Sequence, residues 1–266
     1  MKPYYQDKWV TIYHGDCREI LPQLDVKVDL VLTSPPYDDL RDYGGQGWHF
    51  DGMAPTIFNC VKDGGYCIWI IGDQTINGGE TLSSFNQAIE FCAAGFKLHD
   101  TMIYLKDGFA FPEATRYQPV FEYMFVLVRG KPSYFNPIKR KTVYGAITEL
   151  EHERQKDGSI SAVNMRYRLE TGNVGNVWLY GTGYLKTSKN PDVFKHPCAF
   201  PEQLASDHIY SWSNHNNLIL DPFLGSGTTC YCAKKLNRYS IGIEIEEKYC
   251  EIAAKRCSQE VMELNV

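Results

Sequence analysis

The sequence lacks the long apolar run of a membrane protein. Its longest apolar stretches are Tyr66–Ile71 and Tyr123–Val128, far below the roughly 18–20 residues that cross a bilayer. The first residues, 1–9, have neither the apolar centre nor the small-residue cleavage site of a secretory signal. We therefore expect no membrane span and a cytoplasmic location.

Cysteine and histidine show no grouping of the kind that holds a metal or a disulfide framework. The nine cysteines are an odd number and include no C-x-x-C pair. A zinc site would need clustered ligands, which His14, His49 and His215 do not supply either. We expect reduced, mostly buried thiols and no metal site.

The chain also lacks an excess of basic residues. It has 266 residues, 44% hydrophobic and 22% charged, with a net charge of −5, which fits one large domain or one domain with an inserted lobe. The segment 139–195 departs from this balance, because it carries ten Lys and Arg against six Asp and Glu. Its net charge of +4 leaves −9 for the remainder. The segment is either a solvated charged face or a lobe that contacts a polyanion.

Short β-branched and apolar runs alternate with helical patterns, which predicts a doubly wound, mostly parallel sheet of the α/β class. The predicted strands are Val28–Thr33, Tyr66–Ile71, Thr101–Leu105, Tyr123–Val128, Leu218–Leu220 and Ser240–Ile245. The predicted helices are Thr81–Ala94, Thr228–Leu236 and Glu246–Glu263.

A glycine turn follows the strand before Asp221. Gly225 and Gly227 let the backbone approach a ligand closely, and the next strand ends in Glu244, where an acid can bind ribose hydroxyls. Alone this is a weak nucleotide fingerprint, because Cys230 replaces the third glycine, and no Gly-Lys-Ser/Thr of a P-loop is present. A purely structural turn and a dinucleotide-binding oxidoreductase stay open on this motif.

A second motif, Thr33-Ser-Pro-Pro-Tyr37, ends the strand Val28–Thr33 in two prolines. The prolines end the hydrogen-bonded pairing with neighbouring strands, because they lack a backbone N–H, and they hold the backbone extended. The Ser34 hydroxyl and the Pro35 carbonyl would then point off the carboxyl edge of the sheet, where open α/β folds bind ligands. Two acceptors beside an aromatic ring suit a planar group that bears an amino nitrogen, although a proline-rich turn without function remains the alternative.

Together these blocks resemble the S-adenosylmethionine-dependent amino methyltransferases of DNA, in the group whose catalytic motif precedes the cofactor motif. Thr33–Tyr37 matches the catalytic (D/N/S)-P-P-(Y/F) motif, and Asp221–Thr229 matches the cofactor loop. His196–Leu204 is similar to the segment that closes over the methionine part of the cofactor in this group. Asn176–Trp178, which precedes it, is also typical of the group. Tyr13–Cys17 resembles the strand end whose acid reaches the cofactor adenine.

The resemblance implies a Rossmann-like class I methyltransferase with a seven-stranded sheet. Its catalytic part would be 1–138, a small target-recognition insert 139–195, and its cofactor-binding part 196–266. The insert coincides with the +4 segment. Such a division accounts for nearly all of the length and leaves no room for an attached nuclease.

The resemblance also implies the chemistry. Ser34, Pro35, Pro36 and Tyr37 would form the catalytic motif: Tyr37 would stack on a nucleotide flipped out of double-stranded DNA, while Ser34 and Pro35 accept hydrogen bonds from its amino group. Serine in this motif is commoner in enzymes that make N4-methylcytosine and aspartate in those that make N6-methyladenine. We therefore expect an N4-cytosine methyltransferase, with N6-adenine the first alternative and a non-DNA methyltransferase or an oxidoreductase less favoured.

The implied cofactor is S-adenosyl-L-methionine. Asp221, Phe223, Gly225 and Gly227 would shape its methionine side, and Glu244 would accept from its ribose hydroxyls. Thr228 and Thr229 would cap the next helix and bind the carboxylate, Asp16 would bind the adenine amine, and Phe200 and Ile245 would pack on the cofactor. Thr33, Pro222 and Ser226 complete the expected set. Asp16 as a mere turn cap and Phe200 as a mere core residue stay open. A cognate restriction endonuclease is a further partner that the resemblance allows.

Overall fold

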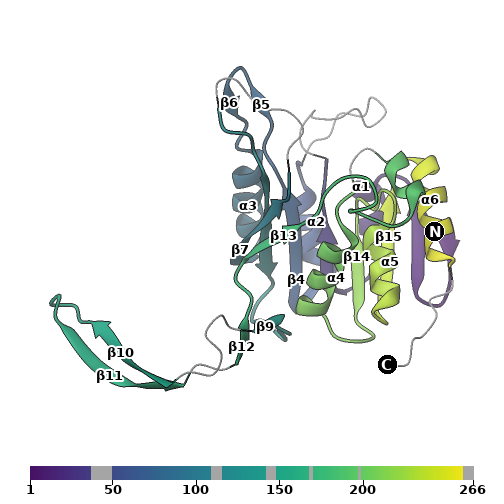
Figure 1. Ribbon diagram of the computed structural model, residues 1–266. Helices are drawn as coiled ribbons and strands as arrows, with labels where there is room; N and C mark the ends of the chain where they lie inside the picture. Colours follow the sequence, from purple (N-terminus) through teal and green to yellow (C-terminus); the bar gives the residue numbers. More distant parts are fainter. Residues whose placement is uncertain (37–49, 109–115, 142–147, 168–169, 197–198, 260–266) are drawn as a thin grey trace. The chain divides into compact units, whose positions relative to one another are not determined.

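The computed structural model describes residues 1–36, 50–108, 116–141, 148–167, 170–196 and 199–259 (Figure 1). Two compact units are present: residues 1–136 with 176–266, and residues 137–175. The smaller unit is thus shorter than the predicted insert, 139–195. Residues 176–195 belong to the larger unit, since β13 (Val177–Tyr180) pairs in parallel with β7 (Lys97–Lys106) of its sheet.

The larger unit is built on a nine-stranded sheet of order β1-β2-β15-β14-β3-β4-β8-β7-β13. The remaining bounds are β1 Tyr5–Gln6, β2 Val10–His14, β15 Tyr239–Glu244, β14 Leu218–Asp221, β3 Val28–Thr33, β4 Val61–Ile71 and β8 Phe121–Val128. Strands β2, β15, β14, β3 and β4 are parallel, and β8 runs antiparallel to both β4 and β7. The short strands β1 and β13 extend the predicted seven-stranded sheet at its two edges.

Every predicted strand is present, and the reason is clearest in β3. All six of its residues are buried. Leu30 and Leu32 point into one core cluster and Val31 into another, because successive strand side chains face opposite sides of a sheet. A strand buried on both faces has to be apolar throughout, which made it conspicuous in the sequence.

Helices cover both faces of the sheet (Figure 1). Helices α1 (Cys17–Leu24), α2 (Met53–Cys60) and α3 (Ser83–Ala93) pack in one core cluster, whereas α4 (Glu202–Trp212), α5 (Thr228–Lys235) and α6 (Glu247–Cys257) pack in the clusters of the other face. The predicted helices correspond to α3, α5 and α6; α6 ends at Cys257, and the predicted end at Glu263 lies outside the described residues. None of the helices in the described part of the chain is both long and apolar enough to cross a bilayer.

Short elements complete the chain. The larger unit also carries the hairpin β5 (Thr75–Ile76) and β6 (Gly79–Glu80) and a 3-10 turn, Pro191–Lys195. In the smaller unit β9 (Lys139–Lys141) pairs with β12 (Thr171–Asn173), and β10 (Thr148–Arg154) with β11 (Ile160–Tyr167), all antiparallel. The smaller unit contains seven Lys and Arg against five Asp and Glu, a net charge of +2.

The cysteines of the described residues are free thiols, and of these eight only Cys92 is exposed. Burial raises the pKa of the Cys17 thiol to about 12, which keeps it protonated and unreactive near neutral pH.

We expect Cys92→Ser to remove one fast-reacting equivalent from a thiol titration of the folded protein with Ellman's reagent. Cys198, outside the described residues, is common to both proteins and cancels in the difference. An unchanged fast phase would contradict the placement of Cys92.

Candidate active site

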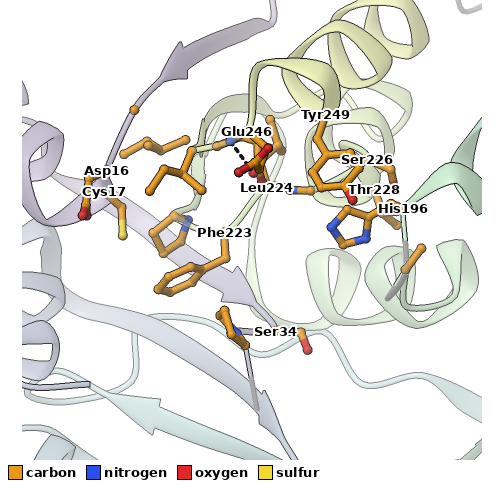
Figure 2. A pocket seen from close by; sticks show the side chains of 18 of the residues that line it. Asp16, Cys17, Ser34, His196, Phe223, Leu224, Ser226, Thr228, Glu246 and Tyr249 are labelled. Carbon is orange, nitrogen blue, oxygen red and sulfur yellow. Dashed lines mark hydrogen bonds between the residues drawn. The ribbon is translucent and has the colours of Figure 1, made fainter. Parts of the chain in front are cut away.

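The two sequence motifs meet because their strands are neighbours. Strand β14 pairs in parallel with β3, Ile219 opposite Leu30 and Leu220 opposite Val31. The glycine turn after β14 and the Ser-Pro-Pro segment after β3 therefore leave the same carboxyl edge of the sheet. An open pocket of about 1000 Å³, counting its mouth and the solvent in it, lies there (Figure 2).

Most of the predicted site residues line this pocket. They are Asp16, Ser34, Pro36, Phe200, Pro222, Phe223, Gly225, Ser226, Thr228, Glu244 and Ile245. Thr33, Pro35, Asp221, Gly227 and Thr229 are not among the lining residues, and Tyr37 lies outside the described residues. The predicted residues thus divide into a lining and a layer behind it.

Asp221 belongs to the layer behind the lining. Its side chain is 1% exposed and accepts hydrogen bonds from Thr33 Oγ1 at 2.6 Å and from the Phe223 amide at 3.1 Å. Burial raises the pKa of its carboxyl to about 6, although the bonds from Thr33 and Phe223 oppose the rise. Asp221 therefore fastens the end of β3 to the start of the glycine loop.

The glycine loop needs glycine at two positions. Gly225 and Gly227 have φ of +52° and +83°, in the left-handed region. A Cβ on Gly225 would lie 2.9 Å from His196 Nε2, and one on Gly227 would lie 2.8 Å from the Ala253 Cβ. Any larger residue at Gly225 would therefore have to displace the imidazole that lines the pocket beside it.

The predicted capping of α5 by two threonines is wrong. The N-cap is Gly227, which has no side chain to accept a bond from the helix amides. Thr229 Oγ1 donates to the Leu32 carbonyl at 3.3 Å, and Thr228 Oγ1 accepts from Arg256 Nη1 at 3.0 Å. Both hydroxyls are directed to protein partners, so the helix N-terminus presents backbone amides and its positive dipole end to a ligand.

Glu244 is a lining acid held by backbone amides. Its side chain accepts from the Gly225 amide at 2.7 Å and from the Glu246 amide at 2.9 Å, the second bond being drawn in Figure 2. Burial raises the pKa of Glu244, and these two bonds oppose the rise. Because each carboxylate oxygen accepts more than one hydrogen bond, Glu244 retains the capacity to accept from ligand hydroxyls.

Asp16 is both a helix cap and a residue of the pocket lining. It is the N-cap of α1 and accepts from the Arg18 amide at 2.8 Å. Its carboxylate also pairs with the Arg18 guanidinium at 2.5 Å, which holds the pKa of Asp16 below its usual value. The residue nevertheless lines the pocket. Phe200 is likewise both half-buried against the core and part of the lining.

Two aromatic side chains of the lining were not given a role from the sequence. His196 and Tyr249 pack edge to face, with ring centroids 4.4 Å apart, and both lie beside Ser226 and Thr228 in Figure 2. The sequence alone places His196 only within a motif and Tyr249 only within a predicted helix. A usable signal was the start of α6 directly after β15, which brings the first turn of that helix to the same sheet edge.

The chain matches a family model, N6_N4_Mtase, described as DNA methylase, over residues 28–255. It belongs to this DNA methylase family. The chain is thus a DNA methyltransferase that uses S-adenosylmethionine, as the motifs predicted. The orphan methyltransferase M.BamHII of Bacillus amyloliquefaciens is 44% identical over 236 residues, covering 87% of this chain and 89% of that one.

More distant members of the DNA methylase family align over similar lengths. The type II methyltransferase M.SmaI of Serratia marcescens is 28% identical, covering 91% of this chain and 88% of its own. The structure of the cytosine-N4-specific PvuII DNA methyltransferase superposes with a TM-score of 0.68 at 18% identity, covering 100% of this chain and 90% of that one. At this identity the structural match shows the fold, and it confirms the Rossmann-like class I architecture.

The buried carboxyl of Asp221 makes a testable contribution to stability. Since its pKa is about 6 in the folded protein against 3.8 ordinarily, the unfolded chain loses this proton first as the pH rises, and stability falls between about pH 4 and pH 6. Asp221→Asn keeps an oxygen for Thr33 and Phe223 but does not titrate. We expect the stability of the variant, relative to wild type, to rise by up to about 3 kcal/mol across this window.

Urea unfolding of both proteins at pH 4, 5, 6 and 7 measures the effect. All other ionisable groups are shared, so their contributions cancel in the difference. A relative stability that does not change with pH would show that Asp221 titrates normally.

Proposed function

We propose that this DNA methylase transfers the methyl group of S-adenosylmethionine to the exocyclic N4 of a cytosine flipped out of duplex DNA at a specific site. The observation that carries the proposal is one pocket shared by two motifs. Ser34 and Pro36 follow β3, Gly225 and Thr228 follow the adjacent β14, and all four line that pocket. Donor and acceptor of the methyl group would therefore meet at the edge between two neighbouring strands.

The hydrogen-bond donors and acceptors of the lining match those of the cofactor. Backbone amides at the start of α5 suit the methionine carboxylate, and the buried acid Glu244 suits ribose hydroxyls. Asp16 suits the adenine amine, and Phe200 and Phe223 supply apolar contact. When bound, the cofactor supplies an activated methyl group. The chain's own task is to hold it, to exclude water and to present the acceptor nitrogen.

The Ser-Pro-Pro segment orients the acceptor nitrogen. In the proposed complex the Ser34 hydroxyl and the Pro35 carbonyl accept hydrogen bonds from the two N–H groups of the amine. These bonds draw the nitrogen lone pair out of conjugation with the ring and direct it at the methyl carbon. A serine hydroxyl has too high a pKa to act as a carboxylate-like base, so positioning and polarisation carry the step. Tyr37 stacks on the flipped base, a contact worth about 1–3 kcal/mol.

The choice of cytosine rests on Ser34. The family model covers both N6 and N4 methylation, so membership does not decide between them. In the group that the chain resembles, serine before Pro-Pro-Tyr is commoner among enzymes that make N4-methylcytosine. Flipping either base costs a few kcal/mol, so it does not discriminate strongly between the two.

Ser34→Ala tests the assigned chemistry. We expect wild type with labelled S-adenosylmethionine and duplex DNA to yield N4-methylcytosine, identified by mass spectrometry of the nucleosides. Ser34→Ala should lower kcat on the order of 10²-fold, because it removes one preorganised partner of the reacting amine. Ser258→Ala, at an exposed serine after α6, is the matched control and should leave kcat unchanged. N6-methyladenine would overturn the choice of base, and no transfer to any DNA with cofactor bound would overturn the proposal.

The smaller unit, residues 137–175, is proposed to contact DNA phosphates. Lys139, Arg140 and Lys141 form the whole of β9, and all three are exposed. Such cations release counterions from DNA, so that affinity falls with salt.

Replacing Lys139, Arg140 and Lys141 together by alanine tests this contact. We expect the slope of log affinity against log salt to become shallower by about 0.9 for each phosphate that the variant no longer neutralises. Lys2, Lys8 and Lys97 are exposed on the larger unit, and their triple alanine variant is a control with the same change in charge. Equal slopes for the two triple variants, measured by fluorescence anisotropy, would contradict a specific role for β9.

A further inference from the structure

Arg256 is a charged side chain buried behind the pocket. It lies near the end of α6 and is 1% exposed. One terminal nitrogen, Nη1, donates to the Ser226 carbonyl at 3.2 Å and to Thr228 Oγ1 at 3.0 Å, and the other, Nη2, donates to Glu202 Oε1 at 2.6 Å. The guanidinium also lies over the ring of Tyr231, 4.6 Å from its centroid. A single group thus bonds to the glycine loop and to the first residue of α4.

We propose that Arg256 is a positioning residue for the cofactor, which it holds indirectly by fixing the walls of the pocket. Ser226 and Thr228 line the pocket on either side of Gly227. Glu202 begins α4 two residues after Phe200, which also lines the pocket. Through its two nitrogens Arg256 fixes the separation between the glycine loop and the segment that contains Phe200.

The ion pair with Glu202 is held in one geometry from both sides. Glu202 Oε1 also accepts from Ser188 Oγ at 2.5 Å, so the carboxylate is oriented independently of Arg256. The planar guanidinium fork donates in fixed directions, whereas a lysine ammonium has one point of charge. Arg256 is buried, whereas the Glu202 side chain is 24% exposed. Burying the guanidinium costs desolvation energy, and an apolar pair of similar size is often equally stable. Stability alone therefore does not require arginine here.

Arg238 supplies a matched comparison. It is also buried, 3% exposed, and donates to Ser213 Oγ at 3.2 Å, to the Ser213 carbonyl at 2.9 Å and to the Leu236 carbonyl. It precedes β15 and so lies at the amino end of the strand, away from the pocket at the carboxyl end. Loss of this arginine should affect folding and leave cofactor binding intact.

The experiment measures the Kd for S-adenosylmethionine by calorimetry and the Tm of each variant of the full chain. We expect Arg256→Met to lower the Tm and to raise the Kd about tenfold, the effect of losing about 1.4 kcal/mol of binding free energy. The double variant Arg256→Met with Glu202→Met replaces the ion pair by an apolar pair, so its Tm should recover while its Kd stays raised. Arg238→Met should lower the Tm with an unchanged Kd.

Recovery of both the Tm and the Kd in the double variant would overturn the proposal, because Arg256 would then act only through stability. If Arg256→Met does not fold, Arg256→Lys takes its place, and a wild-type Kd in that variant would equally overturn it. The inference rests on the pocket being the cofactor site, which Gly225→Val tests separately. Unchanged cofactor binding by folded Gly225→Val would refute the site itself, independently of Arg256.

Discussion

The hydrogen bond between Thr33 and Asp221 is the interaction on which the site depends. It joins the last residues of two adjacent parallel strands, β3 and β14, at the point where each chain leaves the sheet. On one side follows the Ser-Pro-Pro segment and on the other the glycine loop. Two motifs far apart in sequence are thereby fixed side by side, at the carboxyl edge where parallel sheets bind ligands. Burying the Asp221 carboxylate costs desolvation energy. The hydrogen bonds that it accepts from Thr33 and from the Phe223 amide offset part of that cost.

Backbone amides form much of the polar framework around the pocket. Glu244 is oriented by the Gly225 and Glu246 amides, and the start of α5 is left without a side-chain cap because the N-cap is Gly227. Glycine at positive φ allows this close approach, and helix α6 packs against Gly227 through Ala253 so that a Cβ would not fit. The loop is therefore held between the acid on one side and a helix on the other, in a conformation that other residues would strain.

The sequence predicted the strands that depend on a local apolar pattern. It did not predict which partners side chains turn to in the folded chain. β3 has its predicted bounds because an apolar run buried on both faces is unambiguous. Thr228 and Thr229 follow a glycine turn, as capping residues would, yet their hydroxyls point to Arg256 and to Leu32, a choice that no local pattern encodes. The smaller unit ends at Gly175, before the end of the charged segment 139–195, because surface charge does not follow compact units. The edge strand β13 is apolar throughout but largely exposed, and it lies among glycine and asparagine residues of the charged segment, so the sequence did not mark it as part of the sheet.

Charge is divided within the molecule in a way that suits its two ligands under the proposed function. The smaller unit carries +2 of a total of −5, which leaves −7 on the larger unit. Three acids, Asp16, Glu244 and Glu246, line the pocket with one cation, Arg18, which pairs with Asp16, so the lining is net negative. S-adenosylmethionine carries a positive sulfonium that becomes a neutral thioether once the methyl group has left, so nearby acids favour the donor over the spent product. Under the proposed function the acidic lining would favour binding of the charged cofactor, while DNA phosphates would be met by local clusters of cations such as Lys139–Lys141, whose effect does not depend on the net charge of the chain.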